Sequence, residues 1–407
     1  MIPRFKPYLG RQELLAAFRQ QEHAVAHFEE AFASTFEARY AVAFRYGRSG
    51  LWAFFKALGI EGAEVIMPAF TCVVVAHAVV LSGNIPRFVD VTLYDYNMDL
   101  EQVAAAINER TRAIIAIHLF GYPLNVNRLD EIIGAAEARW GHKIWVIQDC
   151  AHALGARWQG RLVCNAGDAA LFSLHVSKPL TCIAGGMITT NNAEVHQKLR
   201  AFRDDYFTQM DSFQRFRTLY HLLKSYPRYN EHVYQWVDWL KENTRLLDQR
   251  KPPRRPSAHI RFPQDHLGQM LELEASIGLE QLRKYPELVR HQHENAHYYA
   301  EHLRDTPALK LPPLVEGATY SQYVVRVPNR QALLQTARRR NVHLAPWIDY
   351  SLPTTPACSQ YAMAQEFPNA ELCSQTTVSL PVYAPLTEKQ RARVVESLQW
   401  TCSEKPK

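Results

Sequence analysis

The run Ile144-Trp-Val-Ile-Gln-Asp149 is a short apolar stretch that ends in a carboxylate and is followed by Cys150-Ala-His152-Ala-Leu-Gly155. Such a run predicts a strand buried on both faces of a sheet. A carboxylate at its end can cap the next helix, bind a metal or pair with a cofactor nitrogen, and the helix cap is the commonest of these. Position 149 therefore marks a strand end, where open α/β sheets bind their ligands.

Strands and helices alternate along the chain on both sides of this run. Short β-branched runs predict the strands, and apolar residues at helical spacing predict the helices between them. The alternation is typical of a mainly parallel sheet with helices on both faces. The expected strands are 64–67, 87–91, 112–118, 143–148, 169–174 and 186–190, and the expected helices are 12–36, 49–58, 71–82, 99–108, 126–140 and 193–202.

The chain divides into a large domain over 1–202, an insertion over 203–264 and a smaller domain over 265–407. The insertion holds ten aromatic residues between positions 206 and 239, which predict either packing inside a helical hairpin or a subunit interface, or else a membrane-surface face. The basic, proline-rich run 250–256 predicts a solvated loop, with a phosphate clamp as the alternative.

Helices and strands mix without regular alternation in the last part of the chain, as in an α+β unit. Pro286 is expected to interrupt the first helical pattern of this part, because proline removes a backbone N–H and clashes with the preceding turn. The expected helices are 266–285, 295–303, 330–340 and 388–398, and the expected strands are 322–327 and 377–381.

Composition places the chain among ordinary folded proteins. It has 407 residues, of which 47% are hydrophobic and 21% charged, and its net charge of +6 favours anionic ligands without reaching a nucleic-acid signature. The seven cysteines form no Cys-x-x-Cys pair, so neither a disulfide framework nor a metal site is expected. No signal peptide or transmembrane segment is expected either, because the most apolar stretch, 65–81, is short and carries Pro68 and His77. A cytoplasmic location fits best.

Two further groups of residues lie beside predicted strand ends or helix starts. Ser173-Leu-His175-Val-Ser177-Lys178 follows a strand, where a desolvated lysine amine could form a Schiff base, although most lysines at such places are surface groups. Tyr46-Gly47-Arg48-Ser49-Gly50 opens a helix whose backbone amides could bind a phosphate, and a Gly-x-x-Gly by itself is weak evidence for this. Together with Asp149 they are the parts that a pyridoxal phosphate enzyme needs.

With these residues in this order, the chain resembles the DegT/DnrJ/EryC1/StrS family of pyridoxal phosphate-dependent sugar aminotransferases. The resemblance runs from about Ala41 to Leu398, and it implies a fold-type I enzyme with a mainly parallel seven-stranded sheet and a smaller C-terminal α+β domain. Besides the three groups above, the stretches similar to family motifs are 59–71, 88–90, 96–99, 118–121, 148–156, 367–371, 379–383 and 386–387.

The resemblance also implies a role for each matching residue. Lys178 carries the cofactor as a Schiff base and moves the proton of the reaction, while Asp149 keeps the pyridine nitrogen protonated. The other implied cofactor-binding residues are His152 beside the ring hydroxyl, Ser173, Gly47, Arg48 and Ser49 at the phosphate, and Cys72, which stands where the family commonly has an aromatic that stacks on the ring.

The implied activity is transfer of an amino group from L-glutamate to a nucleotide-linked keto-sugar, in amino-sugar, polysaccharide or natural-product biosynthesis, by a homodimer. Two alternatives stay open. One is another pyridoxal phosphate reaction on a non-nucleotide or lipid-like ketone. The other is a non-catalytic family member that uses the 203–264 insertion to bind a partner or a membrane surface.

Overall fold

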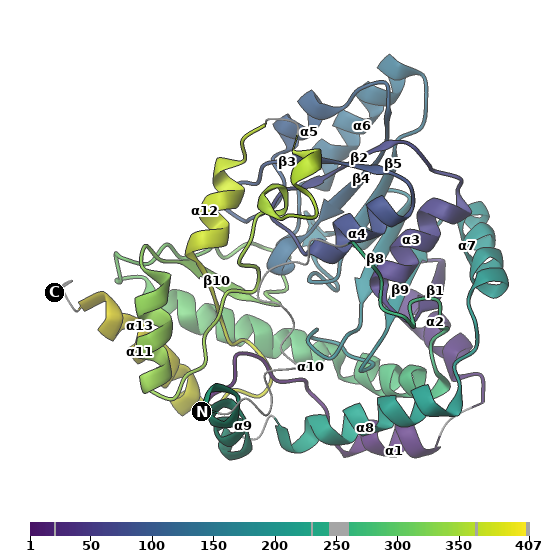
Figure 1. The fold of residues 1–407 in the computed structure, drawn as a ribbon. Coiled ribbons are helices and arrows are strands. Elements are labelled where there is room, and N and C mark those ends of the chain that lie inside the picture. The colour runs from purple at the N-terminus through teal and green to yellow at the C-terminus, as the bar shows by residue number, and fades with distance from the viewer. Residues whose placement is uncertain (20–21, 229–230, 244–259, 363–364, 404–407) are drawn as a thin grey trace.

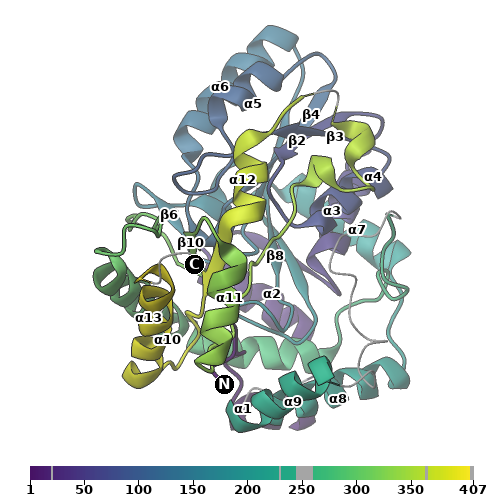
Figure 2. The ribbon, with the colours of Figure 1, turned by 60° about the vertical axis from the view of Figure 1, so that its left-hand side comes forward.

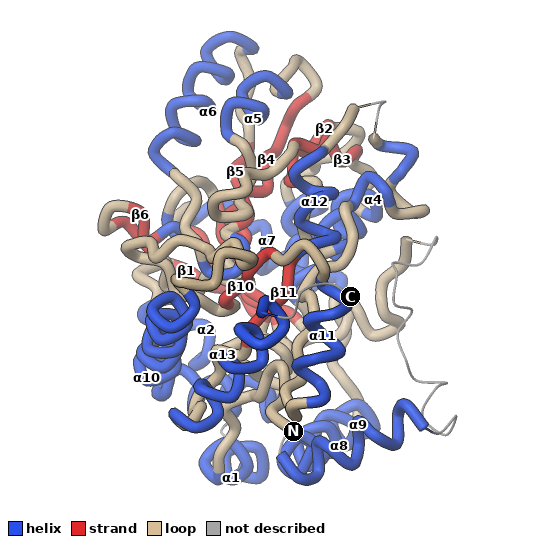
Figure 3. Tube along the Cα trace, turned by 90° about the vertical axis from the view of Figure 1, so that its left-hand side faces the viewer, coloured by secondary structure: helices blue, strands red, loops and turns tan. Residues whose placement is uncertain are grey.

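The computed structural model describes residues 1–19, 22–228, 231–243, 260–362 and 365–403. A seven-stranded sheet, ordered β1-β9-β8-β5-β4-β2-β3, runs through its centre (Figures 1 and 3). Only β9 runs opposite to the other strands of this sheet. The predicted mainly parallel sheet is therefore confirmed. Its strands are β1 (Tyr40–Phe44), β2 (Glu64–Pro68), β3 (Ile85–Val89), β4 (Thr111–Ile117), β5 (Trp145–Asp149), β8 (Ala169–Ser173) and β9 (Gly186–Thr190).

Helices cover both faces of the sheet. Along β4, Ile115 and Ile117 pack in one apolar cluster with α3 and α4, whereas Ile114 and Ala116 pack in another with α5 and α6. Alternate side chains of a strand point to opposite faces, which is why the buried central strands are apolar throughout. The covering helices are α2 (Ala24–Thr35), α3 (Gly47–Ala57), α4 (Val73–Leu81), α5 (Leu100–Ala106), α6 (Val126–Trp140) and α7 (Ala193–Tyr206).

Capping residues fix several helix starts close to their predicted positions. The Asp99 carboxylate accepts hydrogen bonds from the backbone N–H groups of the first turn of α5, and Asn125 and Asn192 cap α6 and α7 in the same way. The prediction of one helix over 12–36 is wrong, because α1 (Arg11–Arg19) and α2 are separate helices. Strand β1 was not predicted from the sequence, since its five residues lie between two strong helical patterns.

Helix α10 (Glu272–Leu303) continues without a break through Pro286, so the prediction that this proline interrupts the helix is wrong. A proline inside a helix costs about 3 kcal/mol. Here the helix buries apolar side chains on both sides of the proline, among them Leu282 and Leu288. Burying such side chains contributes about 1.5–3 kcal/mol each, which offsets the cost and keeps the helix continuous.

The C-terminal region carries its own small sheet, in which β10 (Tyr323–Arg326) pairs antiparallel with β11 (Thr377–Leu380). Figure 2 shows α11 (Arg330–Arg339), α12 (Pro368–Thr376) and α13 (Glu388–Ser403) in this region. A short hairpin, β6 (Arg157–Trp158) and β7 (Arg161–Leu162), belongs to neither sheet. The predicted α/β class with a smaller C-terminal α+β unit is confirmed.

The segment between α7 and α10 forms two helices, α8 (Ser212–Arg228) and α9 (Glu231–Asn243). Helix α8 lies beside α1 (Figures 1 and 2), and Leu222 of α8 is buried against Leu273 of α10. The opposite side of α8 carries Phe213, Phe216, Tyr220 and Leu223, which are between 45% and 69% exposed; we call these four residues the aromatic face of α8. Within the described ranges, no helix is both long and apolar enough to cross a membrane. The basic run 250–256 lies outside the described residues.

Gly186 allows β9 to pass close to the start of α3. A Cβ atom at position 186 would lie 2.2 Å from the backbone nitrogen of Gly47, a contact that cannot be relieved by a side chain. We expect Gly186→Ala to lower the free energy of unfolding by about 1–3 kcal/mol or more, because the backbone must move. Gly134→Ala is the matched control, since its site in α6 is open and alanine favours a helix by about 1 kcal/mol. Urea denaturation of both variants checks this. Equal stability of the two would contradict the packing described.

Candidate active site

A cavity at the carboxyl ends of β4, β5 and β8 brings the three predicted groups of residues together. Asp149 ends β5, Ser173 ends β8, and Gly47 begins α3. Parallel strands that end at one edge place these residues side by side, although more than 100 positions separate the first group from the last. Of the eight predicted site residues, seven line the cavity: Gly47, Arg48, Cys72, Asp149, His152, Ser173 and Lys178.

Asp149 lies at the bottom of this cavity and is only 5% exposed. Its Oδ1 accepts a hydrogen bond of 2.9 Å from the backbone N–H of Ala151, and the described residues supply no second donor. Burial raises the pKa of the carboxyl group, against the effects of this hydrogen bond and of the Lys178 charge. A buried carboxylate with one hydrogen bond is poorly stabilised, so the site suits a ligand that brings a donor or a positive charge.

Lys178 lies on the loop after β8, where its Nζ is 2.9 Å from Nε2 of His152. Burial lowers the pKa of the lysine, and the negative charge of Asp149 only partly opposes this. Burial also lowers the pKa of His152 well below its ordinary value, and the Lys178 charge adds to the effect. His152 is therefore neutral, its Nε2 accepts from Lys178, and its Nδ1–H donates to Oγ of Ser321 at 3.3 Å.

The other end of the cavity is built from the first turn of α3. Gly47 and Arg48 line it together with Ser173, and the backbone N–H groups at the start of a helix favour anions. Arg48 adds a fixed positive charge there. Burial lowers the pKa of the nearby His77 to about 4, and the charge of Arg48 adds to this effect. Ser49, the eighth predicted residue, does not line the cavity. It is fully buried, and its hydroxyl donates instead to the carbonyl oxygen of His266 at 2.7 Å.

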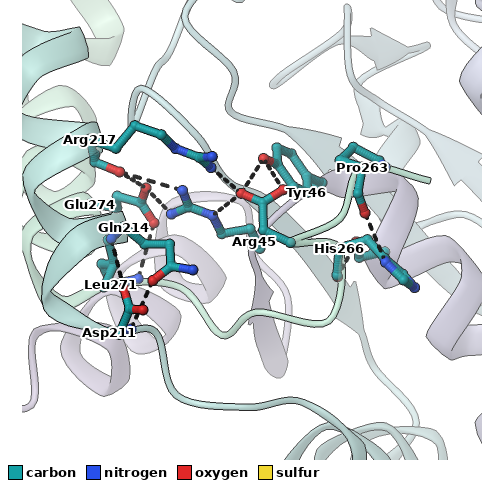
Figure 4. Close-up of polar contacts among 12 residues, drawn as sticks. Arg45, Tyr46, Asp211, Gln214, Arg217, Pro263, His266, Leu271 and Glu274 are labelled. Atoms are coloured by element: carbon teal, nitrogen blue, oxygen red, sulfur yellow. Dashed lines mark hydrogen bonds and ion pairs between the residues drawn. The ribbon is translucent and has the colours of Figure 1, made fainter.

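An ionic cluster, buried except for the Arg217 side chain, ties the start of α3 to the inserted helix α8 (Figure 4). Arg45 is 2% exposed and pairs with Glu274 of α10, while Arg217 of α8 pairs with Asp265. Asp265 also accepts a hydrogen bond of 3.0 Å from the hydroxyl of Tyr46, the residue before Gly47. Two cations thus face two carboxylates, and these pairs fix the backbone that leads into the first turn of α3.

Sequence reasoning missed Trp347, which enters the cavity from the C-terminal region. Its ring meets that of His152 edge-on, with centroids 5.5 Å apart. The resemblance implies a ring-stacking aromatic at the position of Cys72, and the large aromatic side chains that line the cavity with Cys72 are Trp347 and Tyr46. No local motif marks position 347, because only the folded chain brings it near residues 72 and 152.

Comparison with known proteins identifies the family of the chain. The model of the DegT/DnrJ/EryC1/StrS aminotransferase family matches residues 12–232 and 239–399. The chain belongs to this family. It is a pyridoxal phosphate-dependent aminotransferase, as the sequence predicted.

Individual relatives are similar over nearly the whole chain. The chain is 28% identical over 381 residues to a pleiotropic regulatory protein of Geobacillus stearothermophilus, covering 92% of this chain and 88% of that protein. The structure resembles AtS13 from Actinomadura melliaura with a TM-score of 0.78 and 26% identity, covering 98% of each chain. It also resembles the sugar aminotransferase CalS13 from Micromonospora echinospora with a TM-score of 0.79 and 22% identity, covering 98% of this chain and 100% of that one.

The residues present fit the cofactor of the family. Asp149 is a buried carboxylate that lacks a cationic partner of its own among the described residues, and a protonated pyridine nitrogen is such a partner. Lys178 has an amine whose pKa is lowered, as a Schiff-base lysine requires. Arg48 and the start of α3 supply positive charge where a phosphate needs it.

The raised pKa of Asp149 gives a prediction about the cofactor-free protein. The folded state binds the proton of this carboxyl group more tightly than the unfolded chain does, so ionisation at neutral pH costs stability. Asp149→Asn keeps the shape and removes the buried charge. We expect a higher thermal midpoint for the cofactor-free variant at pH 7, a smaller loss of stability between acid and neutral pH, and cofactor binding weakened about 10-fold or more.

Thermal unfolding without cofactor, followed by titration with pyridoxal phosphate, measures both effects. A variant that melts lower than the wild type and binds the cofactor as tightly would contradict the role of burial at this position.

Proposed function

We propose that this aminotransferase moves an amino group from L-glutamate to the keto group of a nucleotide-linked sugar. The observation that carries the proposal is the placement of the Lys178 amine in one cavity with buried Asp149 and neutral His152. Support for a sugar acceptor comes from relatives of the same fold. One is the sugar aminotransferase CalS13, and another is PseC of Helicobacter pylori, an aminotransferase involved in the biosynthesis of pseudoaminic acid.

Pyridoxal phosphate, when bound, supplies an electron sink that stabilises negative charge on the substrate carbon beside the transferred nitrogen. The Lys178 amine would hold the cofactor. Its amine then takes the proton from the donor carbon and later returns a proton during transfer. A lysine whose pKa is lowered by burial suits this work, because a base near neutrality is most effective. Asp149 holds the ring nitrogen in its protonated state.

The neighbouring residues orient these two groups. His152 accepts a hydrogen bond from Lys178 and is itself oriented by Ser321, so the amine is directed to one side of the cavity. Arg48, Ser173 and the backbone of Gly47 hold the cofactor phosphate. Ser49 stabilises this turn through its hydrogen bond to the carbonyl oxygen of His266 and does not contact the phosphate.

We also propose that the protein is a homodimer whose interface covers the aromatic face of α8. Four large apolar side chains on one side of a helix are rarely left exposed by a monomer, and the centre of a stable interface is apolar and rich in aromatic residues. The ionic cluster of Arg217 holds α8 against the active-site turn, so a second subunit on this helix would lie close to the cavity.

The acceptor proposal is tested with purified holoenzyme, L-glutamate and a panel of nucleotide-linked and free keto-sugars, with mass spectrometry of the amine products. We expect amination of at least one nucleotide-linked keto-sugar, and a loss of at least 1000-fold in Lys178→Ala, because the amine placed to move the proton is gone. The exposed Lys198→Ala is the control and should keep full activity. Amination of free ketones alone would contradict the nucleotide link.

The dimer is tested by light scattering of the double variant Phe213→Ser/Phe216→Ser. We expect the wild type to have twice the mass of one chain and the variant to dissociate at low concentration, since two apolar anchors are lost from the interface. Tyr94→Ser, which removes a side chain that is 66% exposed elsewhere, is the matched control and should stay dimeric. A monomeric wild type, or a double variant as dimeric as the control, would contradict the interface.

A further inference from the structure

A second cavity, with about 230 Å³ of enclosed space, lies between the active site and the inserted helix α8; we call it the α8 cavity. Tyr46 and His175 line both this cavity and the active-site cavity, so the two spaces meet at these side chains. Another part of its wall comes from α8, with Arg217, Thr218, His221 and Ser225. The insertion therefore contributes a wall to a space beside the active site.

The side of α8 that lines this cavity differs from its aromatic face. Arg217, His221 and Ser225 are spaced four residues apart, so they lie on one side of the helix. The aromatic face, at positions 213, 216, 220 and 223, lies on another side. The proposed homodimer and a ligand in the α8 cavity thus use different sides of the same helix.

Arg217 has donor groups left for a ligand. Its Nη2 pairs with Asp265, while its Nε and Nη1 make no hydrogen bond to any residue in the described ranges, and the side chain is 41% exposed. The carboxylates of the ionic cluster, Asp265 and Glu274, do not line the α8 cavity, and its described lining holds no other aspartate or glutamate. A ligand there meets the guanidinium without meeting a carboxylate, which favours an anion.

His175 offers a second donor at the point where the two cavities meet. Desolvation lowers the pKa of its ring to about 4, and the charge of Lys178 adds to this effect, so the ring is neutral. Its Nδ1 accepts from the backbone N–H of Ser177 at 3.5 Å, which places the ring proton on Nε2. Among the described residues this Nε2–H has no partner, so it is available to an oxygen atom of a ligand.

We propose that the α8 cavity binds the diphosphate of the nucleotide-linked acceptor, with Arg217 and the Nε2–H of His175 as donors. The inference rests on the proposed function and adds where the charged part of the acceptor lies. The keto carbon and the diphosphate of such a sugar are attached to one ring, so their sites must adjoin, as the two cavities do. Arg217 matches this ligand because a planar guanidinium donates two parallel N–H groups to phosphate oxygens.

Inorganic pyrophosphate is the probe, because it carries the diphosphate group without a nucleoside. It is titrated calorimetrically into the holoenzyme, so that pyridoxal phosphate already fills its own phosphate site. Arg217→Gln removes the cation, and Ser225→Asp adds a carboxylate to the cavity wall without altering the ionic cluster. Arg215→Gln, which changes an exposed arginine of α8 outside the cavity lining, is the matched control.

We expect both cavity variants to raise the Kd for pyrophosphate about 10-fold or more, because one loses a charge-assisted hydrogen bond and the other gains a repulsive charge. The half-saturating concentration of the nucleotide-linked keto-sugar should rise in the same variants. The control should match the wild type in both measurements. If Arg217→Gln disturbs the ionic cluster, Ser225→Asp decides the test.

A wild type that does not bind pyrophosphate, or cavity variants that bind it as the wild type does, would overturn the inference and leave the acceptor proposal standing. Weaker pyrophosphate binding with an unchanged half-saturating keto-sugar concentration would also overturn it, because the cavity would then hold a free anion. A wild type that aminates free ketones alone would refute the proposed acceptor, and the inference with it.

Discussion

The burial of one carboxylate and one amine in the same cavity is the constraint on which the site depends. Asp149 and Lys178 are both pushed toward their neutral forms by desolvation, and the protein offers each of them little compensation. A cofactor with a cationic ring nitrogen and an aldehyde satisfies both groups at once. The two desolvated groups therefore destabilise the cofactor-free protein, and the same desolvation favours cofactor binding and prepares both groups for the chemistry.

The rest of the chain holds these two groups in place from a distance. The sheet fixes Asp149 at the end of β5, and the close passage of Gly186 past Gly47 sets the first turn of α3 beside β8. The insertion reinforces that turn, because Arg217 of α8 reaches it through Asp265. The N-terminal segment 4–8 and Trp347 of the C-terminal region line cavities that Lys178 also lines. Segments from the whole length of the chain therefore meet at one amine.

The fold and most of the residues that line the cavity could be predicted because their signals are local. An apolar strand ending in Asp149 and a serine five residues before Lys178 are visible within single motifs. Ser49 shows the limit of this reasoning, since its hydroxyl donates to the His266 carbonyl and does not line the cavity. Trp347 has no motif, because tertiary contacts alone bring it to the site. The helix across Pro286 was missed for the same reason: packing outweighs local propensity there.

The covalent partner of the cofactor is the central claim, and it can be measured directly. The protein is loaded with pyridoxal phosphate, reduced with borohydride, digested and mapped by mass spectrometry. The account predicts one modified lysine, Lys178, and no modification when L-glutamate is added before the reduction, because the donor then carries the cofactor away from the lysine. A label on another lysine, or none on a protein that binds the cofactor, would contradict it.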